Sequence, residues 1–223
     1  VPHKKGVRSN VDHYATQLRN YVLEPLHERL GVDISDEAVL AAVKEHNELC
    51  GIISEIGEMR KLPNPPITGY EFHVINLVSL VCPKYLVIDK LRETLEELKT
   101  REPDEKPGWK VRVVLAGSEN DDPEFTKLIE SCGALVVADR HCYGSLPGRE
   151  PIVLKEGEPV LKSIARHYLE HSECPRYMGT EVVHGRKRYL KNLYDEYHAD
   201  GVILEQMKFC EYWGYESVAD SLI

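Results

Sequence analysis

The sequence predicts an α/β protein in which a mainly helical region is followed by a doubly wound parallel sheet. In the first part of the chain, apolar residues recur with the spacing of amphipathic helices. A charged, proline-rich stretch, residues 101–109, then interrupts this pattern. Beyond it, short buried-type strands alternate with helices, which is typical of a parallel sheet with helices on both faces. We therefore expect a helical connecting region in residues 1–108 and an α/β domain in residues 109–223.

Local start and stop signals delimit the first helices. Asn10 is placed to cap a first helix, and Gly31 is placed to end it. Ser35 is followed by two acidic residues and opens a second helix, which stops before Pro63. The first region therefore begins with two consecutive helices.

Two further helices are predicted before the charged link. The stretch from Thr68 to Glu71 fits a capping box, in which the hydroxyl and the carboxylate satisfy backbone donors reciprocally. The apolar helix that follows runs through Val81. Pro83 then separates it from a more charged helix that reaches about Thr100.

The α/β domain contains three predicted strands, and two of them are followed by a cysteine. The strands are residues 111–117, 134–139 and 201–206, and the helices are residues 121–133, 159–171 and 185–199. Open α/β sheets bind ligands beyond the carboxyl ends of their strands. Cys142 and Cys210 lie just beyond two of these ends, which makes them the main chemical signal in the sequence.

Composition excludes several classes of protein. The chain has 223 residues, of which 42% are hydrophobic and 29% charged, and its formal net charge is -9. Such acidity argues against a general nucleic-acid binder. The longest apolar stretch, residues 74–82, is too short to span a membrane. No signal peptide is visible, so we expect a cytoplasmic protein with reduced thiols. The first residue is not Met and the last ones read as the first turns of a helix, so we expect a piece of a longer polypeptide.

Six cysteines are spread along the chain without a CxxC pair. Three lie on helical segments or a helix end, where we expect small buried hydrophobes: Cys50, Cys82 and Cys132. Cys142 and Cys210 have polar or aromatic loop residues around them, so structural and functional roles are equally open. Cys174 precedes a proline and favours neither role.

The residues alone leave three kinds of cysteine chemistry open. His141 could serve as a base for a nucleophilic Cys142, although neighbours in a loop often point apart. A zinc site usually has ligands with paired short spacing, which are absent here. An iron–sulfur cluster takes thiolates that need not be close in sequence. The sequence contains no P-loop, GxGxxG or HExxH motif, and the basic start of the helix at residues 185–191 indicates a solvated face.

Several stretches together resemble one protein family. ADRHCYGS and QMKFCEYWGYE are similar to segments of the 2-hydroxyacyl-CoA dehydratase / benzoyl-CoA reductase family, and the chain looks like a truncated 2-hydroxyglutaryl-CoA dehydratase D-component. The resemblance covers nearly the whole chain in the right order, in residues 1–22, 34–49, 65–71, 120–145 and 185–216.

The resemblance implies an architecture and a set of partners. Each subunit of this family has two flavodoxin-like α/β domains joined by helices, so residues 1–108 would follow a missing N-terminal domain and residues 109–223 would be flavodoxin-like. The family implies an iron–sulfur subunit of an anaerobic acyl-CoA enzyme, with a homologous second catalytic subunit. A separate ATP-hydrolysing iron–sulfur activator delivers low-potential electrons one at a time.

The resemblance leaves the reaction open. Dehydratases of the family form a ketyl radical from a 2-hydroxyacyl-CoA, whereas reductases dearomatise benzoyl-CoA. We lean toward benzoyl-CoA reductase-type ring reduction. The alternatives are a 2-hydroxyacyl-CoA dehydratase, a double-cubane-cluster reductase and a non-catalytic scaffold subunit.

Site residues carry over by position. Cys210 matches the cysteine of the family's KFC motif and is the expected ligand of a 4Fe-4S or double-cubane cluster, with Cys142 as the weaker candidate. The residues expected around substrate or cluster are Ser118, Glu119, His141, Gly144, Ser145, Lys208, Phe209 and Trp213. Asp139-Arg140 and Leu146 depart from the family pattern, which leaves the substrate open.

Overall fold

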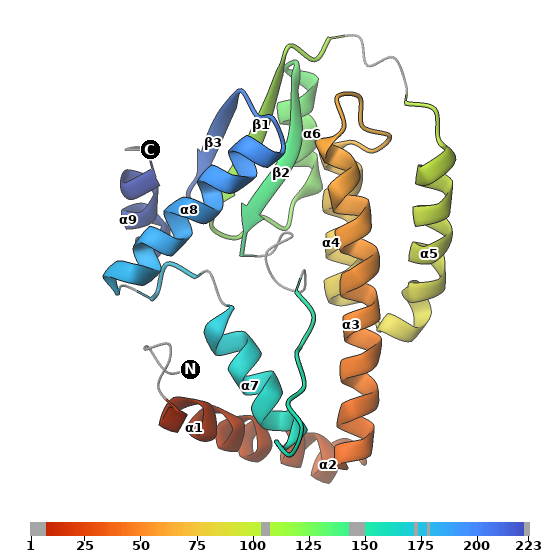
Figure 1. The fold of residues 1–223 in the computed structure, drawn as a ribbon, viewed down its shortest axis with the longest axis vertical. Coiled ribbons are helices and arrows are strands. Elements are labelled where there is room, and N and C mark those ends of the chain that lie inside the picture. Colours follow the sequence, from red (N-terminus) through yellow and green to blue (C-terminus); the bar gives the residue numbers. More distant parts are fainter. Residues whose placement is uncertain (1–7, 104–107, 143–149, 172–173, 178, 221–223) are drawn as a thin grey trace.

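The computed structural model describes residues 8–103, 108–142, 150–171, 174–177 and 179–220 (Figure 1). The helices of these residues are α1 Arg8–Leu18, η1 Arg19–Leu23, α2 Glu24–Leu30, α3 Asp36–Glu58, η2 Met59–Lys61, α4 Gly69–Val81, α5 Lys84–Thr100, α6 Pro123–Ser131, α7 Val160–Glu170, α8 Thr180–Glu196 and α9 Glu211–Asp220. The strands are β1 Val111–Gly117, β2 Ala134–His141 and β3 Gly201–Glu205. None of the described helices is both long and apolar enough to cross a membrane.

The strands form one parallel sheet in the order β2-β1-β3, with helices on both faces (Figure 1). On one face, strand residues pack with Leu190 and Leu193 of α8. On the other, strand residues pack with Phe125 and Ile129 of α6, and α4 lies beside α6. This arrangement confirms the predicted fold class, and the strand order is the beginning of the flavodoxin-like order.

The predicted helix caps are mostly confirmed. The Ser35 hydroxyl accepts a hydrogen bond from the backbone N–H of Ala38 at 3.2 Å. Both bonds of the capping box that joins Thr68 and Glu71 are present, at 3.0 and 2.8 Å. Gly31 ends α2 in the left-handed conformation, with φ of 67°. The prediction for Asn10 is wrong, because this residue lies inside α1.

A π-helical segment interrupts the first helix just before Pro25. A five-residue π-helix, η1, directly precedes α2, and Pro25 lies in the first turn of α2. A proline lacks the N–H for the regular helical bond and its ring crowds the preceding turn. Wider π-helical turns are one way in which a continuous helix accommodates such a disturbance.

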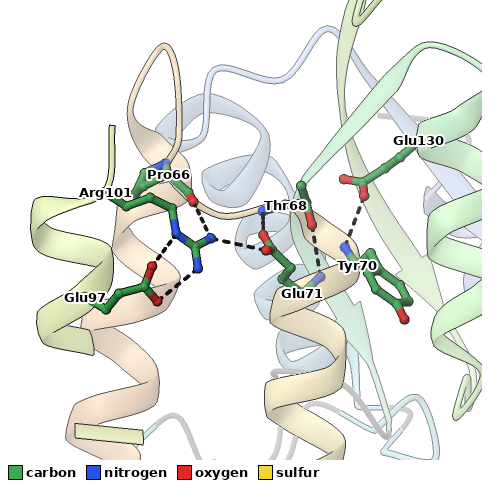
Figure 2. Close-up of polar contacts among 7 residues, drawn as sticks. All are labelled: Pro66, Thr68, Tyr70, Glu71, Glu97, Arg101 and Glu130. Atoms are coloured by element: carbon green, nitrogen blue, oxygen red, sulfur yellow. Dashed lines mark hydrogen bonds and ion pairs between the residues drawn. The ribbon is translucent and has the colours of Figure 1, made fainter. Parts of the chain in front are cut away.

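The N-terminus of α4 docks directly on the sheet (Figure 2). The Glu130 carboxylate of α6 accepts hydrogen bonds from the backbone N–H groups of Gly69 and Tyr70, at 2.8 and 3.2 Å. A carboxylate at a helix N-terminus satisfies free N–H groups and complements the helix dipole. A Cβ at Gly69 would lie 2.5 Å from the carbonyl oxygen of Val136, so only glycine permits this approach.

Arg101 joins the end of α5 to the same junction (Figure 2). Its Nε and Nη2 donate to the two carboxylate oxygens of Glu97, at 2.8 and 3.0 Å. Its Nη1 donates to the carbonyl oxygen of Pro66 at 3.0 Å and to Glu71 at 3.2 Å. Such a forked contact fixes the orientation of the guanidinium as well as its distance from the carboxylate. The segment that leads into α4 is therefore held by Arg101 on one side and by Glu130 on the other.

Two further arginines connect the helical part to the sheet. Arg60 is fully buried, forms an ion pair with Asp139 of β2 at 3.3 Å, and lies 3.6 Å from the ring centroid of Phe72. Arg112 of β1 donates to the carbonyl oxygens of Arg60, at 2.8 Å, and of Tyr197, at 2.9 Å. Long-range contacts of this kind place η2 and the end of α8 relative to the strands.

Some elements differ from the predicted boundaries. β2 extends two residues beyond the predicted end at position 139, and α8 begins five residues before position 185. The aromatic segment after Cys210, predicted as a loop, is the helix α9. Helix α7 packs against α1 through Leu161, Ala165 and Leu169, although it belongs to the stretch assigned to the α/β domain. The boundary at residue 108 stays a prediction.

The junction at α4 yields a stability prediction. Glu130→Gln is expected to lower the free energy of unfolding by about 2 kcal/mol, because a neutral amide accepts the Gly69 and Tyr70 bonds more weakly. Glu124→Gln is the control, since it removes an exposed carboxylate of α6 that pairs with Lys127. The control is expected to change the free energy by less than about 0.5 kcal/mol. Urea unfolding measures both variants, and equal losses would contradict the role of Glu130.

Candidate functional site

The three strands end level with one another. Gly117 of β1 pairs with His141 of β2 on one side and with Glu205 of β3 on the other. The residues that follow these three therefore emerge along one edge of the sheet. Cys142 is one of them, and Cys210 lies five residues beyond the end of β3. The sequence-based expectation of a common edge holds for these two segments.

Ser118 joins the three strand ends. Its carbonyl oxygen accepts from the N–H of Cys142 at 3.0 Å, and its own N–H donates to the carbonyl oxygen of Glu205 at 3.4 Å. Its hydroxyl accepts from the N–H of Met207 at 2.5 Å. The residue is 2% exposed. Ser118 thus connects the segments that follow β2 and β3 through hydrogen bonds. Because it is buried, it is not accessible to a ligand in this chain.

Gly117 permits the close approach of β3. A Cβ at this position would lie 2.3 Å from the carbonyl oxygen of Glu205 and 2.8 Å from its carboxylate. Real Cβ atoms do not tolerate such distances to a backbone atom, so any side chain would push β3 away. The carboxylate of Glu205 is itself affected, because burial raises its pKa while a hydrogen bond from Ser118 opposes the rise.

β2 presents different chemistry on its two faces. Successive side chains of a strand point to opposite sides. Asp139 and His141 face the helical part, where they line a small cavity together with Arg60 and His73. Arg140 and Cys142 face the other way, toward Trp213 of α9. The ion pair of Arg60 with Asp139 and the contact of Cys142 with Trp213 therefore lie on opposite faces of β2.

His141 is unsuited to be a base for Cys142. Burial lowers the pKa of its imidazole to about 4, with a small further decrease from His73 and an opposing effect from Asp139. The ring lies edge-on to His73, with 6.4 Å between ring centroids. Because His141 and Cys142 point to opposite faces, His141 is not placed to act as a base for Cys142.

Trp213 connects α9 to Cys142. Its indole Nε1–H donates to the Cys142 sulfur at 3.0 Å, and the side chain is 2% exposed. Burial raises the pKa of the Cys142 thiol, the Trp213 hydrogen bond opposes this, and the Cys174 and Cys210 thiols add to the rise. Cys174 and Cys210, which are far from Cys142 in sequence, are therefore each close enough to influence the Cys142 thiol.

Cys210 begins α9. Its N–H donates to the carbonyl oxygen of Met207 at 3.0 Å, which closes a turn, and its carbonyl oxygen accepts from Gly214 at 3.0 Å. Phe209 has a positive φ of 72°, so the chain reverses sharply just before the cysteine. A residue at a helix N-terminus lies where the dipole favours negative charge, and thiolates profit from this position.

The other expected site residues are distributed differently. Glu119 and Lys208 are exposed, and Phe209 is 87% exposed, so its ring points into solvent. Gly144 and Ser145 lie outside the described residues. Cys50 is buried as predicted, Cys82 is half-buried, and the prediction for Cys132 is wrong because this thiol is exposed at the end of α6. Among the described side chains, no group of three His, Cys, Asp or Glu residues is placed to hold a metal ion.

A buried ionic group behind the cysteines was not expected from the sequence. Arg140, Arg186 and Glu216 are all buried and in contact. The basic segment at residues 185–191 was assigned to a solvated face, which is wrong for Arg186. A signal was present, because Arg186 lies four residues before Leu190 and seven before Leu193, on the apolar side of the same helix.

The depressed pKa of His141 predicts a loss of stability in acid. An unfolded histidine has a pKa of about 6.5, so the folded state binds this proton only at a lower pH than the unfolded state does. The contribution of neutral His141 to the free energy of unfolding is fully present above the unfolded-state pKa. It is lost as the pH falls toward the folded-state pKa of about 4. The loss is about 3 kcal/mol at most.

Urea unfolding at pH 7 and 4.5 measures this loss, and His141→Gln is expected to reduce the difference between the two pH values. The exposed His184→Gln, on α8, is the control and should retain the difference. An unchanged pH dependence in His141→Gln would contradict the assignment.

Comparisons with known proteins agree with the resemblance described above. Residues 1–219 match the family described as "2-hydroxyglutaryl-CoA dehydratase, D-component". The "(R)-phenyllactyl-CoA dehydratase beta subunit" of Clostridium sporogenes is 22% identical over 211 residues. This alignment covers 95% of the chain and 54% of the relative, so the chain spans about half the length of the curated relative that it matches. The chain belongs to the 2-hydroxyglutaryl-CoA dehydratase D-component family.

Proposed function

We propose that this chain is part of a subunit of an enzyme that removes water from a 2-hydroxyacyl-CoA. The observation that carries the proposal is the family match, which extends over residues 1–219. The relative in Clostridium sporogenes is also named as a dehydratase. Neither comparison supports benzoyl-CoA ring reduction, so dehydration replaces the reaction favoured from the sequence.

We infer that Cys210 is a ligand of an iron–sulfur cluster and that Cys142 is a second, weaker candidate. Thiolate sulfur is the soft donor that such clusters require. The hydrogen bond from Trp213 to the Cys142 sulfur is the kind of contact that tunes a cluster thiolate. The described residues do not complete a metal site by themselves, so the remaining ligands would come from elsewhere in the full-length protein or its partner.

A bound cluster of this kind would supply one low-potential electron to the thioester. The chain's own residues have a supporting role. Ser118 and Gly117 fix the ends of the strands relative to one another, and the turn closed by the Met207 carbonyl oxygen places Cys210 directly before α9. Trp213 covers one side of Cys142 with a buried apolar surface. Exclusion of water protects radical species from side reactions.

The proposal includes two protein partners. The relative is named as a beta subunit, which supports a homologous second subunit in the assembly. A low-potential electron requires a donor, and we propose an ATP-hydrolysing iron–sulfur activator for this step. The substrate is an acyl-CoA thioester with a hydroxyl group at C2.

The test uses the full-length subunit with its partner subunit, purified without oxygen. Incubation with activator, ATP, a reductant and a 2-hydroxyacyl-CoA is expected to yield the 2-enoyl-CoA and water. Benzoyl-CoA serves as the competing substrate. Consumption of benzoyl-CoA instead of the hydroxy thioester would overturn the dehydratase assignment, and turnover of neither would favour a scaffold or a double-cubane reductase.

The role of Cys210 is tested by its iron content. Cys210→Ser is expected to lose most of its iron and sulfide, because a serine oxygen is a harder and poorer ligand for iron than a thiolate. Cys132→Ser is the matched control, since this exposed thiol lies at the far end of α6. Iron analysis and electron paramagnetic resonance measure both. Full iron content and an unchanged spectrum in Cys210→Ser would show that this cysteine is not a ligand.

A further inference from the structure

A buried ionic group connects the three segments that carry Cys142, Cys174 and Cys210. At its centre, Arg186 of α8 is 0% exposed. Its Nε and Nη2 donate to the two carboxylate oxygens of Glu216, at 2.7 and 2.9 Å. This forked geometry restrains both the separation and the relative orientation of α8 and α9.

Other contacts of this group lead to segments that carry cysteines. Arg186 Nη1 donates to the carbonyl oxygen of Tyr177 at 2.7 Å, and the N–H of Tyr177 donates to the carbonyl oxygen of Cys174 at 3.2 Å. Arg140 Nη2 donates to Glu216 at 3.3 Å, and Arg140 lies two residues before Cys142. The Arg186 guanidinium and the Glu216 carboxylate therefore link three segments: the turn after Cys174, the end of β2 and helix α9.

The spacing along α9 extends this link to Cys210. Cys210, Trp213 and Glu216 are three residues apart in succession, so they lie near one face of the helix. Trp213 and Glu216 are both buried on that face. The Arg140 guanidinium lies 5.0 Å from the Trp213 ring, and the Trp213 indole donates to Cys142. The bonds to Glu216 therefore restrain the face of α9 that carries Trp213.

We propose that Arg186 and Glu216 are positioning residues that hold Cys142, Cys174 and Cys210 at one site. A buried ion pair contributes little net stability, but removal of one partner leaves a buried charge without compensation. Its benefit is a defined arrangement of the segments that it joins.

The first test measures thiol proximity and does not require a cluster. The full-length subunit with its partner is reduced, freed of metal and treated with dibromobimane, which fluoresces strongly only after it bridges two thiols. Mass spectrometry identifies the bridged cysteines. Wild type is expected to give a bridge between Cys142 and Cys210 or Cys174. Arg186→Met and Glu216→Gln are expected to reduce the yield of this bridge at least fivefold.

Matched variants separate positioning from loss of folding. Lys191→Met is the control, because it removes an exposed ion pair with Asp195 from the same helix, and it should bridge like wild type. Arg186→Lys keeps the charge without the fork and should not restore the bridge. Glu216→Gln keeps the side-chain shape, so its circular dichroism should resemble that of wild type. Normal bridging in folded Glu216→Gln, or no bridging in wild type, would overturn the proposal.

A second measurement relates the positioning role to the proposed function, on which it rests. In anaerobically purified protein, Glu216→Gln is expected to retain iron but to show a shifted electron paramagnetic resonance spectrum and reduction potential. An unchanged spectrum and potential would overturn the positioning role. Wild type without iron would overturn the proposed function alone, since the bridging experiment does not depend on the cluster.

Discussion

The close contact of three parallel strand ends at Gly117 is the constraint on which the site depends. No side chain fits between this residue and the Glu205 backbone, and the next residue, Ser118, bonds to both neighbouring segments. Because the last residues of the three strands pair with one another, the segments after β2 and β3 begin at the same edge of the sheet. Two cysteine-bearing segments that are far apart in sequence can meet there only under this condition.

The two faces of β2 have different surroundings: one packs against the helical part, and the other carries the residues next to Cys142. Asp139 and His141 are held against the helical part, where Arg60 compensates the carboxylate and burial keeps the imidazole neutral. Arg140 and Cys142 belong to the opposite face, where the buried Arg140 pairs with Glu216 of α9 and the exposed Cys142 accepts a hydrogen bond from Trp213. Three polar residues in succession, Asp139 to His141, are buried at the end of β2. Buried polar groups without partners are costly, and the ion pairs of Asp139 and Arg140 reduce this cost.

Local patterns predicted the fold well because their causes are local. The alternation of strands and helices, the cap at Ser35 and the capping box at Thr68 each depend on residues within a few positions of one another. The length of β2 and the burial of Arg186 could not be predicted in this way. Their partners, such as Glu216, lie 30 or more residues away, so the polar side chains resembled a loop and a solvated face.

The location of Cys210 shows how a long-range contact changes the interpretation of a motif. A glycine and several aromatic residues after this cysteine favoured a loop, yet the segment is a helix because Trp213 and Glu216 both gain buried partners on one face. The cysteine therefore occupies a helix N-terminus instead of a flexible loop. A helix that is clamped at Glu216 restricts the positions available to Cys210 far more than a loop would. Rigid placement is what a multi-ligand site requires, because each ligand must be held close to its bonding geometry before the others can bind.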